Sequence, residues 1–201
     1  MAFLRSYTGS ENTLVIEGRG LWLRPPHMSD YAQWAELRAL SRDHLMPWEP
    51  QWSRDELSRF AFRRRVKHYQ RESAEDQGYA FLILDAGNDQ LLGGLTFTSV
   101  RRGVTQSAAL GYWLGLPNAG RGIMSEAVRA AVSHAFEAFK LHRVEAATQP
   151  ANQRSIRVLE RNGFEREGFS RSYLKINGVW ADHVLFGRIA GDNSQPGVPQ
   201  A

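Results

Sequence analysis

The residues best suited to chemistry are two glycines that flank an arginine where a long helix should begin. Gly120, Arg121 and Gly122 follow a predicted strand over 107–115, and apolar residues at four-residue spacing begin directly after them. The first amides of a helix lack partners within it and carry the positive end of its dipole, so such a turn can hold a phosphate. Glycine turns of this kind also occur for steric reasons alone. The turn lacks the lysine of a Walker loop and the third glycine of a dinucleotide fingerprint.

Other chemistries are limited by composition. The chain has no cysteine, which excludes disulfides, thiolate metal ligands and a cysteine nucleophile. Its six histidines show no close pairing of the HExxH kind, so no metal site is expected. The net charge of +4 includes a basic run over 63–71 in a predicted helix. That run is interpreted as a solvated helix face rather than a nucleic-acid footprint.

The elements that must position the glycine turn alternate between strands and helices. Hydrophobic periodicity, caps and turn residues predict strands over 13–24, 79–86, 90–100, 107–115 and 142–148, two more around Asn177-Gly178, and helices over 29–40, 53–71, 123–140 and 152–164. This order is typical of a mixed α/β fold with a mostly antiparallel sheet. We expect one domain over 13–190 with tails at 1–12 and 191–201. Without an apolar run that spans a bilayer or a signal-peptide pattern, we expect a cytoplasmic protein with no membrane partner.

Several separated stretches carry a family resemblance. They are "MPWEP" (46–50), "LGYWLG" (110–115), the turn at 117–122, "LHRVEAATQPANQRSIRVLERNGFEREG" (141–168) and "YLKINGVWADHVLF" (173–186). Together they resemble the GNAT superfamily of acetyl-CoA-dependent N-acetyltransferases, and within it the subgroup that acetylates the N-terminal alanine of ribosomal protein S5. The resemblance implies a sheet splayed between its fourth and fifth strands, with helices on both faces.

The resemblance also implies where acetyl-CoA binds, as the co-substrate of a reaction that needs no metal. The family's glycine signature holds the pyrophosphate, and pantetheine pairs with the end of the fourth strand. The cofactor residues implied here are Trp113, Leu114, Gly115, Gly120, Arg121, Gly122, Ile123, Met124, Ser125, Asn152 and Ser155. Pro117 departs from the signature, which has Gln or Arg at that position.

Two polar residues are implied to act near the thioester. The matching serine in the family is thought to protonate the CoA sulfur, which assigns that role to Ser155. Asn152 is implied to hold the cofactor or a water. N-terminal helix positions favour these residue types anyway, so the alternative interpretation is that Asn152 is a helix cap and Ser155 a polar residue of the first turn.

The base that deprotonates the amine is left open by the sequence. Glu145, in the middle of a strand, is a candidate through a water, although pairing with Arg143 explains it equally well. Some relatives have an acidic residue where this chain has Ser172. Asp182 and His183 are adjacent on a strand, so at most one of them faces the cleft.

The acceptor is expected to bind at the loop that contains Trp48, Glu49 and Trp52. Two tryptophans offer flat walls and the carboxylate can meet an ammonium, while closure of the core by the tryptophans is the alternative. The leading hypothesis is acetylation of a protein α-amine, with ribosomal protein S5 as the first target considered. A small-molecule amine is the second, and a non-catalytic CoA-binding or ribosome-associated protein the third. No nucleic-acid contact is required, and the oligomeric state is not predicted.

Overall fold

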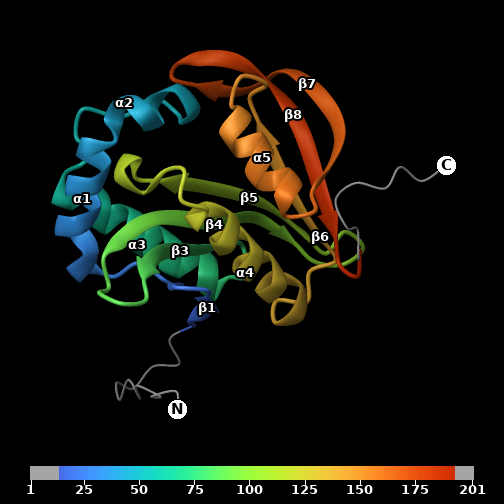
Figure 1. Ribbon diagram of the computed structural model, residues 1–201, viewed down its shortest axis with the longest axis horizontal. Helices are drawn as coiled ribbons and strands as arrows, with labels where there is room; N and C mark the ends of the chain where they lie inside the picture. The colour runs from blue at the N-terminus through green and yellow to red at the C-terminus, as the bar shows by residue number, and fades with distance from the viewer. Residues whose placement is uncertain (1–13, 193–201) are drawn as a thin grey trace.

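A single eight-stranded sheet forms the centre of the computed structural model, which describes residues 14–192 (Figure 1). Its strands lie in the order β1-β2-β3-β4-β5-β6-β8-β7, and every neighbouring pair is antiparallel except β5 with β6. The strands are β1 (Ile16–Gly18), β2 (Leu21–Arg24), β3 (Tyr79–Asp85), β4 (Leu91–Arg101), β5 (Ser107–Leu114), β6 (Arg143–Thr148), β7 (Glu165–Ile176) and β8 (Val179–Ile189). The predicted mixed α/β class is confirmed. The predicted tail at 1–12 and nearly all of the one at 191–201 lie outside the described residues.

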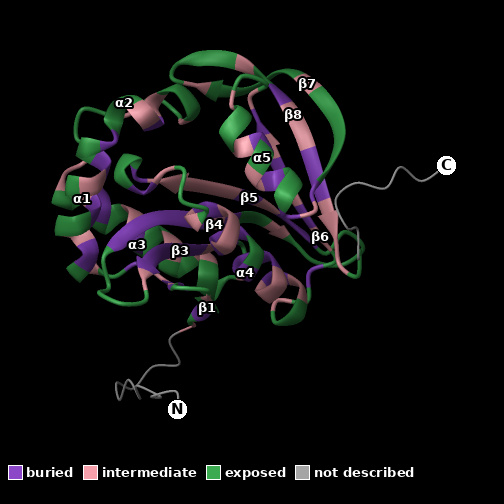
Figure 2. Ribbon diagram, viewed as in Figure 1, coloured by how far each residue is buried: buried purple, intermediate pink, exposed green. Residues whose placement is uncertain are grey.

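Helices cover both faces of the sheet. They are α1 (Tyr31–Leu40), α2 (Arg42–Leu45), α3 (Arg59–Ala74), α4 (Ile123–Glu137) and α5 (Gln153–Arg161), with short 3₁₀ turns at Met28–Asp30, Met46–Trp48 and Leu116–Asn118. Side chains of α4 and α5 belong to one apolar cluster, and those of α1 and α3 to a second. The sheet therefore lies between two helical layers, apart from its β7 edge, most of which is exposed (Figure 2).

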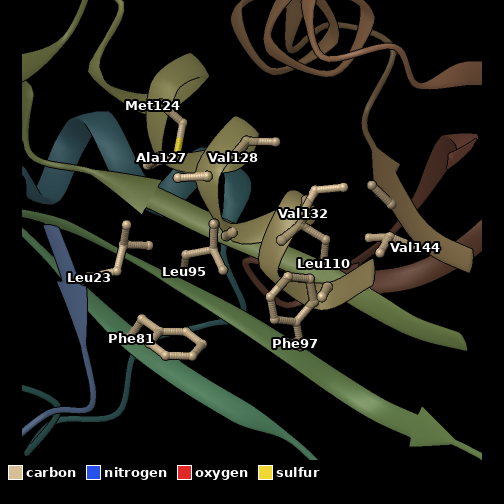
Figure 3. Close-up of a cluster of buried hydrophobic side chains, with 14 of the residues drawn as sticks. Leu23, Phe81, Leu95, Phe97, Leu110, Met124, Ala127, Val128, Val132 and Val144 are labelled. Carbon is tan, nitrogen blue, oxygen red and sulfur yellow. The ribbon is translucent and has the colours of Figure 1, made fainter. Parts of the chain in front are cut away.

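The larger core lies between α4 and the middle strands. Met124, Ala127, Val128 and Val132 point from α4 toward the strand side chains Leu23, Phe81, Leu95, Phe97 and Leu110 (Figure 3). The predicted four-residue spacing puts these residues on one face of α4, which explains why the helix packs flat on the sheet. Each fully buried Val or Leu contributes about 1.5–3 kcal/mol. This packing fixes the start of α4 against the end of β5.

The sheet opens between β5 and β6. The two strands pair only from Ser107 to Ala109, opposite residues 143–145, after which β5 continues to Leu114 beside β4 alone. Meanwhile β6 pairs along its whole length with β8. As Figure 1 shows, β5 and β6 meet at one end and then diverge. The predicted splay is therefore present between the fifth and sixth strands of this chain.

The strand numbering shifts because the first predicted strand is a hairpin. The sequence predicts one strand over 13–24, but Arg19 and Gly20 form a turn between β1 and β2. Gly20 has a φ of 73°, a left-handed conformation that favours glycine. Apolar residues on both sides of the turn make the stretch look continuous in sequence.

The third helix begins later than predicted. The sequence places its start after Ser53, yet that hydroxyl donates a hydrogen bond to the Asp55 carboxylate at 2.8 Å within a non-helical turn. Ser58 is the actual cap, because its hydroxyl accepts a hydrogen bond from the Ala61 amide at 3.0 Å. The short helix α2, which the sequence did not predict, leads into the aromatic loop that starts at Met46.

Candidate active site

A cleft of about 1080 Å³ opens where β5 and β6 diverge. Its walls come from the end of β5, the end of β6, the first turn of α4, one face of α5, and the segment from Asp43 to Glu49. The cleft holds most of the predicted site residues: Trp48, Glu49, Trp113, Leu114, Gly120, Gly122, Ile123, Met124, Ser125, Asn152 and Ser155. Residues more than one hundred positions apart thus share one cavity because the sheet splits there.

The glycine turn has the geometry of an anion cradle. Gly120 and Gly122 both have a φ of 78°, and a Cβ at either position would meet nothing within 4 Å. The Glu126 amide makes the first bond of the helix, to the Gly122 carbonyl at 3.1 Å. The amides of Ile123, Met124 and Ser125 therefore precede the intrahelical ladder, and no side chain of Gly122 can cap them. They are positioned to bind an anion in the cleft.

Two hydrogen bonds to other parts of the chain anchor the loop before this turn. The Leu116 amide donates to Ser41 Oγ at 2.8 Å, and Asn118 Nδ2 donates to the Leu92 carbonyl at 3.1 Å. Ser41 and Asn118 are both buried. Pro117 lies within the 3₁₀ turn at Leu116–Asn118, where its fixed φ suits the local conformation. The departure from the family signature at Pro117 thus belongs to a rigid loop that ends in the glycine turn.

Three arginines on α5 add positive charge to the same cleft. Arg154, Arg157 and Arg161 line it along one face of this helix. The sequence interpretation missed them, although their spacing of three and four residues places them on one side of a helix. Together with the α4 amides they make the cleft cationic.

A hydroxyl pair lies between the diverging strands. Ser155 Oγ and the Tyr112 hydroxyl are 2.8 Å apart, and the Tyr112 hydroxyl is 3.3 Å from the Ser155 carbonyl. Burial raises the pKa of Tyr112 to about 12, and the hydrogen bond with Ser155 opposes this weakly. The phenol therefore stays protonated at neutral pH. The sequence does not predict the Tyr112 side chain as part of the site, because 43 residues separate it from Ser155.

Asn152 is a helix cap, as its alternative interpretation predicts. Its side-chain oxygen accepts a hydrogen bond from the Ser155 amide at 3.1 Å, which starts α5. Capping is compatible with a place in the cleft wall, where Asn152 also lies. Its contribution to the site is to fix the first turn of α5 and with it the position of Ser155.

The loop that contains Trp48, Glu49 and Trp52, called the acceptor loop after its predicted role, is held by an ion pair. Arg38 donates to both carboxylate oxygens of Glu49, at 2.6 and 3.1 Å, and the Trp52 indole donates to one of them at 2.8 Å. Arg38 is 4% exposed and lies 4.6 Å from the Trp52 ring and 5.0 Å from the Trp113 ring. Trp52 lines a separate cavity of about 390 Å³ that shares Glu49 with the main cleft. Glu49 is therefore already neutralised by an internal cation.

Three other predicted residues lie apart from the cleft. Glu145 forms ion pairs with Arg101 at 2.8 Å and Arg143 at 2.9 Å on the outer side of β6, which supports its structural interpretation. A Cβ on Gly115 would lie 2.4 Å from Leu37 Cδ1, so this glycine permits close packing of α1. Arg121 is exposed. None of the three is among the cleft-lining residues, so Glu145 is not positioned to act as a base in the cleft.

Asp182 and His183, which are adjacent on β8, point to opposite sides of the strand, as the alternation of side chains predicts. Asp182 is exposed and accepts a hydrogen bond from the Ser172 amide at 2.8 Å. His183 is 3% exposed and lines the cleft. The second histidine in the cleft wall is His44, whose pKa burial and the Arg154 guanidinium lower below its ordinary value. The cleft wall thus contains two imidazoles.

Two features are absent from residues 14–192. No helix in this range is long and apolar enough to cross a membrane. The same residues contain no cluster of three or more His, Asp or Glu side chains arranged to hold a metal ion.

Comparison with known proteins identifies the family. Residues 20–165 match the model described as "Acetyltransferase (GNAT) domain". The chain is 36% identical to "Probable N-acetyltransferase YjcK" of Bacillus subtilis, over 90% of this chain and all of that protein. It is 33% identical to "[Ribosomal protein uS5]-alanine N-acetyltransferase" of Escherichia coli, over 82% of this chain and 85% of that one. Mycobacterium smegmatis RimJ, solved with CoA-disulfide, superposes with a TM-score of 0.83 at 31% identity, covering 92% of this chain and 90% of RimJ. The chain belongs to the GNAT acetyltransferase family.

Proposed function

We propose that this enzyme transfers the acetyl group of acetyl-CoA to the N-terminal α-amine of a protein, and that ribosomal proteins supply the acceptor. The observation that carries the proposal is the split between β5 and β6, which opens into a single cleft with an anion cradle at one end and an aromatic loop at the other. A cytoplasmic location, as expected from the sequence, fits such an acceptor.

The residues present fit the co-substrate. The open space above Gly120 and Gly122 leaves room for a diphosphate against the first amides of α4, and the α5 arginines supply counter-charge. From Leu110 onward, the β5 edge that faces β6 has no strand beside it, so backbone groups there are free to pair with the amides of a pantetheine arm. Trp113 and Leu114 lie at this edge, in the cleft wall.

Ser155 is the proposed donor to the leaving sulfur. If the Tyr112 hydroxyl donates to Ser155 Oγ across their 2.8 Å contact, the Ser155 proton is free to donate into the cleft. A thiolate with a reference pKa near 8.5 leaves readily when one hydroxyl donates to it. Burial keeps Tyr112 protonated at neutral pH, so its hydroxyl hydrogen is available for this contact.

The acceptor end fits a peptide N-terminus better than a highly charged small amine. Glu49, predicted to meet the ammonium, is paired with Arg38, which leaves less free negative charge than a polycation would need. Trp48 offers a partly exposed flat wall beside it. A relative supports the same choice, since the Escherichia coli enzyme at 33% identity is named for acetylation of an alanine of ribosomal protein uS5.

The test measures CoA release with a thiol reagent across a panel of acceptors. The panel contains an alanine-starting peptide from ribosomal protein S5, the same peptide with a blocked N-terminus, a polyamine and an aminoglycoside. We expect turnover with the free peptide and none with the blocked one. Turnover with the polyamine or aminoglycoside alone would reject the protein acceptor. No turnover with any acceptor, despite tight acetyl-CoA binding, would reject the enzyme activity for all four.

A further inference from the structure

We propose that His183 is the general base that takes the proton from the acceptor ammonium. The inference rests on the proposed acetyl transfer and adds the residue that the sequence left unassigned. His183 lies in the cleft wall where β6 ends, and its Nδ1 contacts the Ala181 carbonyl. The nearby carboxylates of Glu49 and Asp182 already accept hydrogen bonds from other groups.

His183 lies at the open end of the split. In the β6–β8 ladder Val184 is opposite Thr148, the last residue of β6, so His183 stands next to the point where β6 ends. Thr148, Gln149 and His183 all line the cleft there. Gln149 Nε2 donates to the Pro47 carbonyl at 3.0 Å, which ties the acceptor loop to the same corner. An amine that enters past Trp48 therefore arrives beside His183.

The hydrogen bond of the imidazole selects the tautomer that a base requires. His183 Nδ1 lies 2.9 Å from the Ala181 carbonyl oxygen, which can only accept, so Nδ1 carries the hydrogen. In the neutral ring the lone pair is then on Nε2. The Tyr173 ring packs against the imidazole at 5.8 Å and 65°, which limits its rotation. A backbone carbonyl and an aromatic ring thus hold one nitrogen ready to accept a proton.

Other charged groups nearby are less suited to this step. Asp43 and His44 reach the cleft from α2, Glu49 from the loop after it, Tyr112 from β5, and Arg154, Arg157 and Arg161 from α5. Glu49 is bound by Arg38 and Trp52, and Asp182, the neighbour of His183, is bound by the Ser172 amide. Tyr112 is protonated at neutral pH. His44 lies close to the Arg154 guanidinium, which opposes its protonation.

The step balances in protons and charge. The ammonium gives one proton to His183 Nε2, and the neutral nitrogen attacks the thioester carbon as the carbon–sulfur bond breaks. The second proton, lost from nitrogen as the amide forms, neutralises the thiolate, while Ser155 donates a hydrogen bond to the sulfur. His183 afterwards releases its proton to water. An α-amine titrates near 7.7–8.0, so the base matters most below that range.

The test is the pH profile of kcat/KM for His183→Asn with the free peptide. Asparagine keeps a donor for the Ala181 carbonyl and removes Nε2, so the fold is expected to survive, as checked by melting temperature and acetyl-CoA affinity. We expect a loss of about 100-fold near pH 7 that shrinks to a few-fold near pH 9, where the amine is already neutral. His142→Asn, at an exposed position outside the cleft, serves as the matched control.

A structural role would lower the rate equally at every pH, and that result overturns the proposal. The proposal is also overturned if His44→Asn, and not His183→Asn, lowers kcat/KM near pH 7 much more than near pH 9. Nitrogen-15 NMR of the free enzyme gives an independent readout, because the proposal requires the Nδ1–H tautomer at neutral pH; an Nε2–H tautomer contradicts it. If wild-type enzyme acetylates no peptide, the acceptor assignment has failed instead, and the NMR result still tests His183.

Discussion

The two ends of the cleft are built in different ways. The cofactor end consists mainly of backbone from one continuous stretch, the β5 edge, the glycine turn and the first turn of α4. The acceptor end is assembled from side chains of separate elements, among them Glu49 paired with Arg38, and His183 beside Gln149. A site made of backbone groups depends on the backbone conformations that its residues can adopt. A site made of side chains depends on the identity of each side chain and of its hydrogen-bond partner. Substitutions should therefore affect the two ends differently.

The largest expected effect is at the cofactor end. Gly122→Glu places a carboxylate and a strained left-handed residue at the phosphate cradle, so we expect acetyl-CoA affinity to fall on the order of 100-fold. Isothermal titration calorimetry measures it. Gly103→Glu is the matched control, since Gly103 has a φ of 65°, open space around it, and a position outside the cleft. Equal affinities for the two variants would show that the cradle is wrongly placed.

The next effect separates chemistry from cofactor binding. Ser155→Ala removes the proposed donor to the sulfur but leaves the α4 amides intact, so we expect kcat to fall about 30-fold with little change in acetyl-CoA affinity. Tyr112→Phe should lower kcat less, and the double variant should resemble Ser155→Ala alone because the two hydroxyls act as a pair. Full turnover by Ser155→Ala across the pH range would remove its assigned role.

At the acceptor end, Glu49→Gln should affect the peptide without affecting the cofactor. The change leaves the buried Arg38 guanidinium without a counter-charge, and we expect a loss of roughly 2 kcal/mol in the free energy of unfolding. We expect KM for the peptide to rise about 10-fold at constant acetyl-CoA affinity. Steady-state kinetics and denaturant unfolding measure the two quantities. A change in acetyl-CoA affinity as large as that in peptide KM would mean that the two ends are not independent.

The smallest effect concerns the support of the cradle. The Arg129 guanidinium and the Arg19 amide lower the pKa of Glu126 to about 2, from an ordinary value of 4.5. A carboxyl whose pKa is lowered on folding stabilises the fold above its ordinary value, and this contribution disappears as the pH falls toward 2. Glu126→Gln should cost about 1 kcal/mol at pH 7 and nothing near pH 2 by urea unfolding. An equal cost at both pH values would contradict the ion pair. Glu17→Gln on the exposed surface of β1 is the control.

The same contrast explains what could be predicted from the sequence. The strand, glycine turn and helix over 107–137 are contiguous, so their pattern predicts both the fold there and the cradle. Arg38 and Glu49 lie 11 positions apart, on a helix and in a loop, and no periodicity predicts that they pair. Likewise, alternation on β8 shows that only one of Asp182 and His183 faces the cleft, but not which one.

Two errors in the predicted elements have the same local origin. Apolar residues flank the Arg19-Gly20 turn on both sides, which hides the β1–β2 hairpin within one apparent strand. Ser53 and Ser58 are equally good cap residues, and only the hydrogen bond from the Ala61 amide selects Ser58. In both places the sequence permits two conformations. The left-handed turn at Gly20 and the hydrogen bond to Ser58 show which one the chain adopts.

The position of the transferred acetyl group tests the central claim most directly. Tandem mass spectrometry of an alanine-starting peptide that contains one internal lysine, incubated with enzyme and acetyl-CoA, locates the group on one nitrogen. The proposed cleft chemistry predicts acetylation at the N-terminal α-amine, with the lysine unmodified. Acetyl on the lysine alone, or none at all with a free N-terminus, would contradict the assignment of this enzyme as a protein α-amine acetyltransferase.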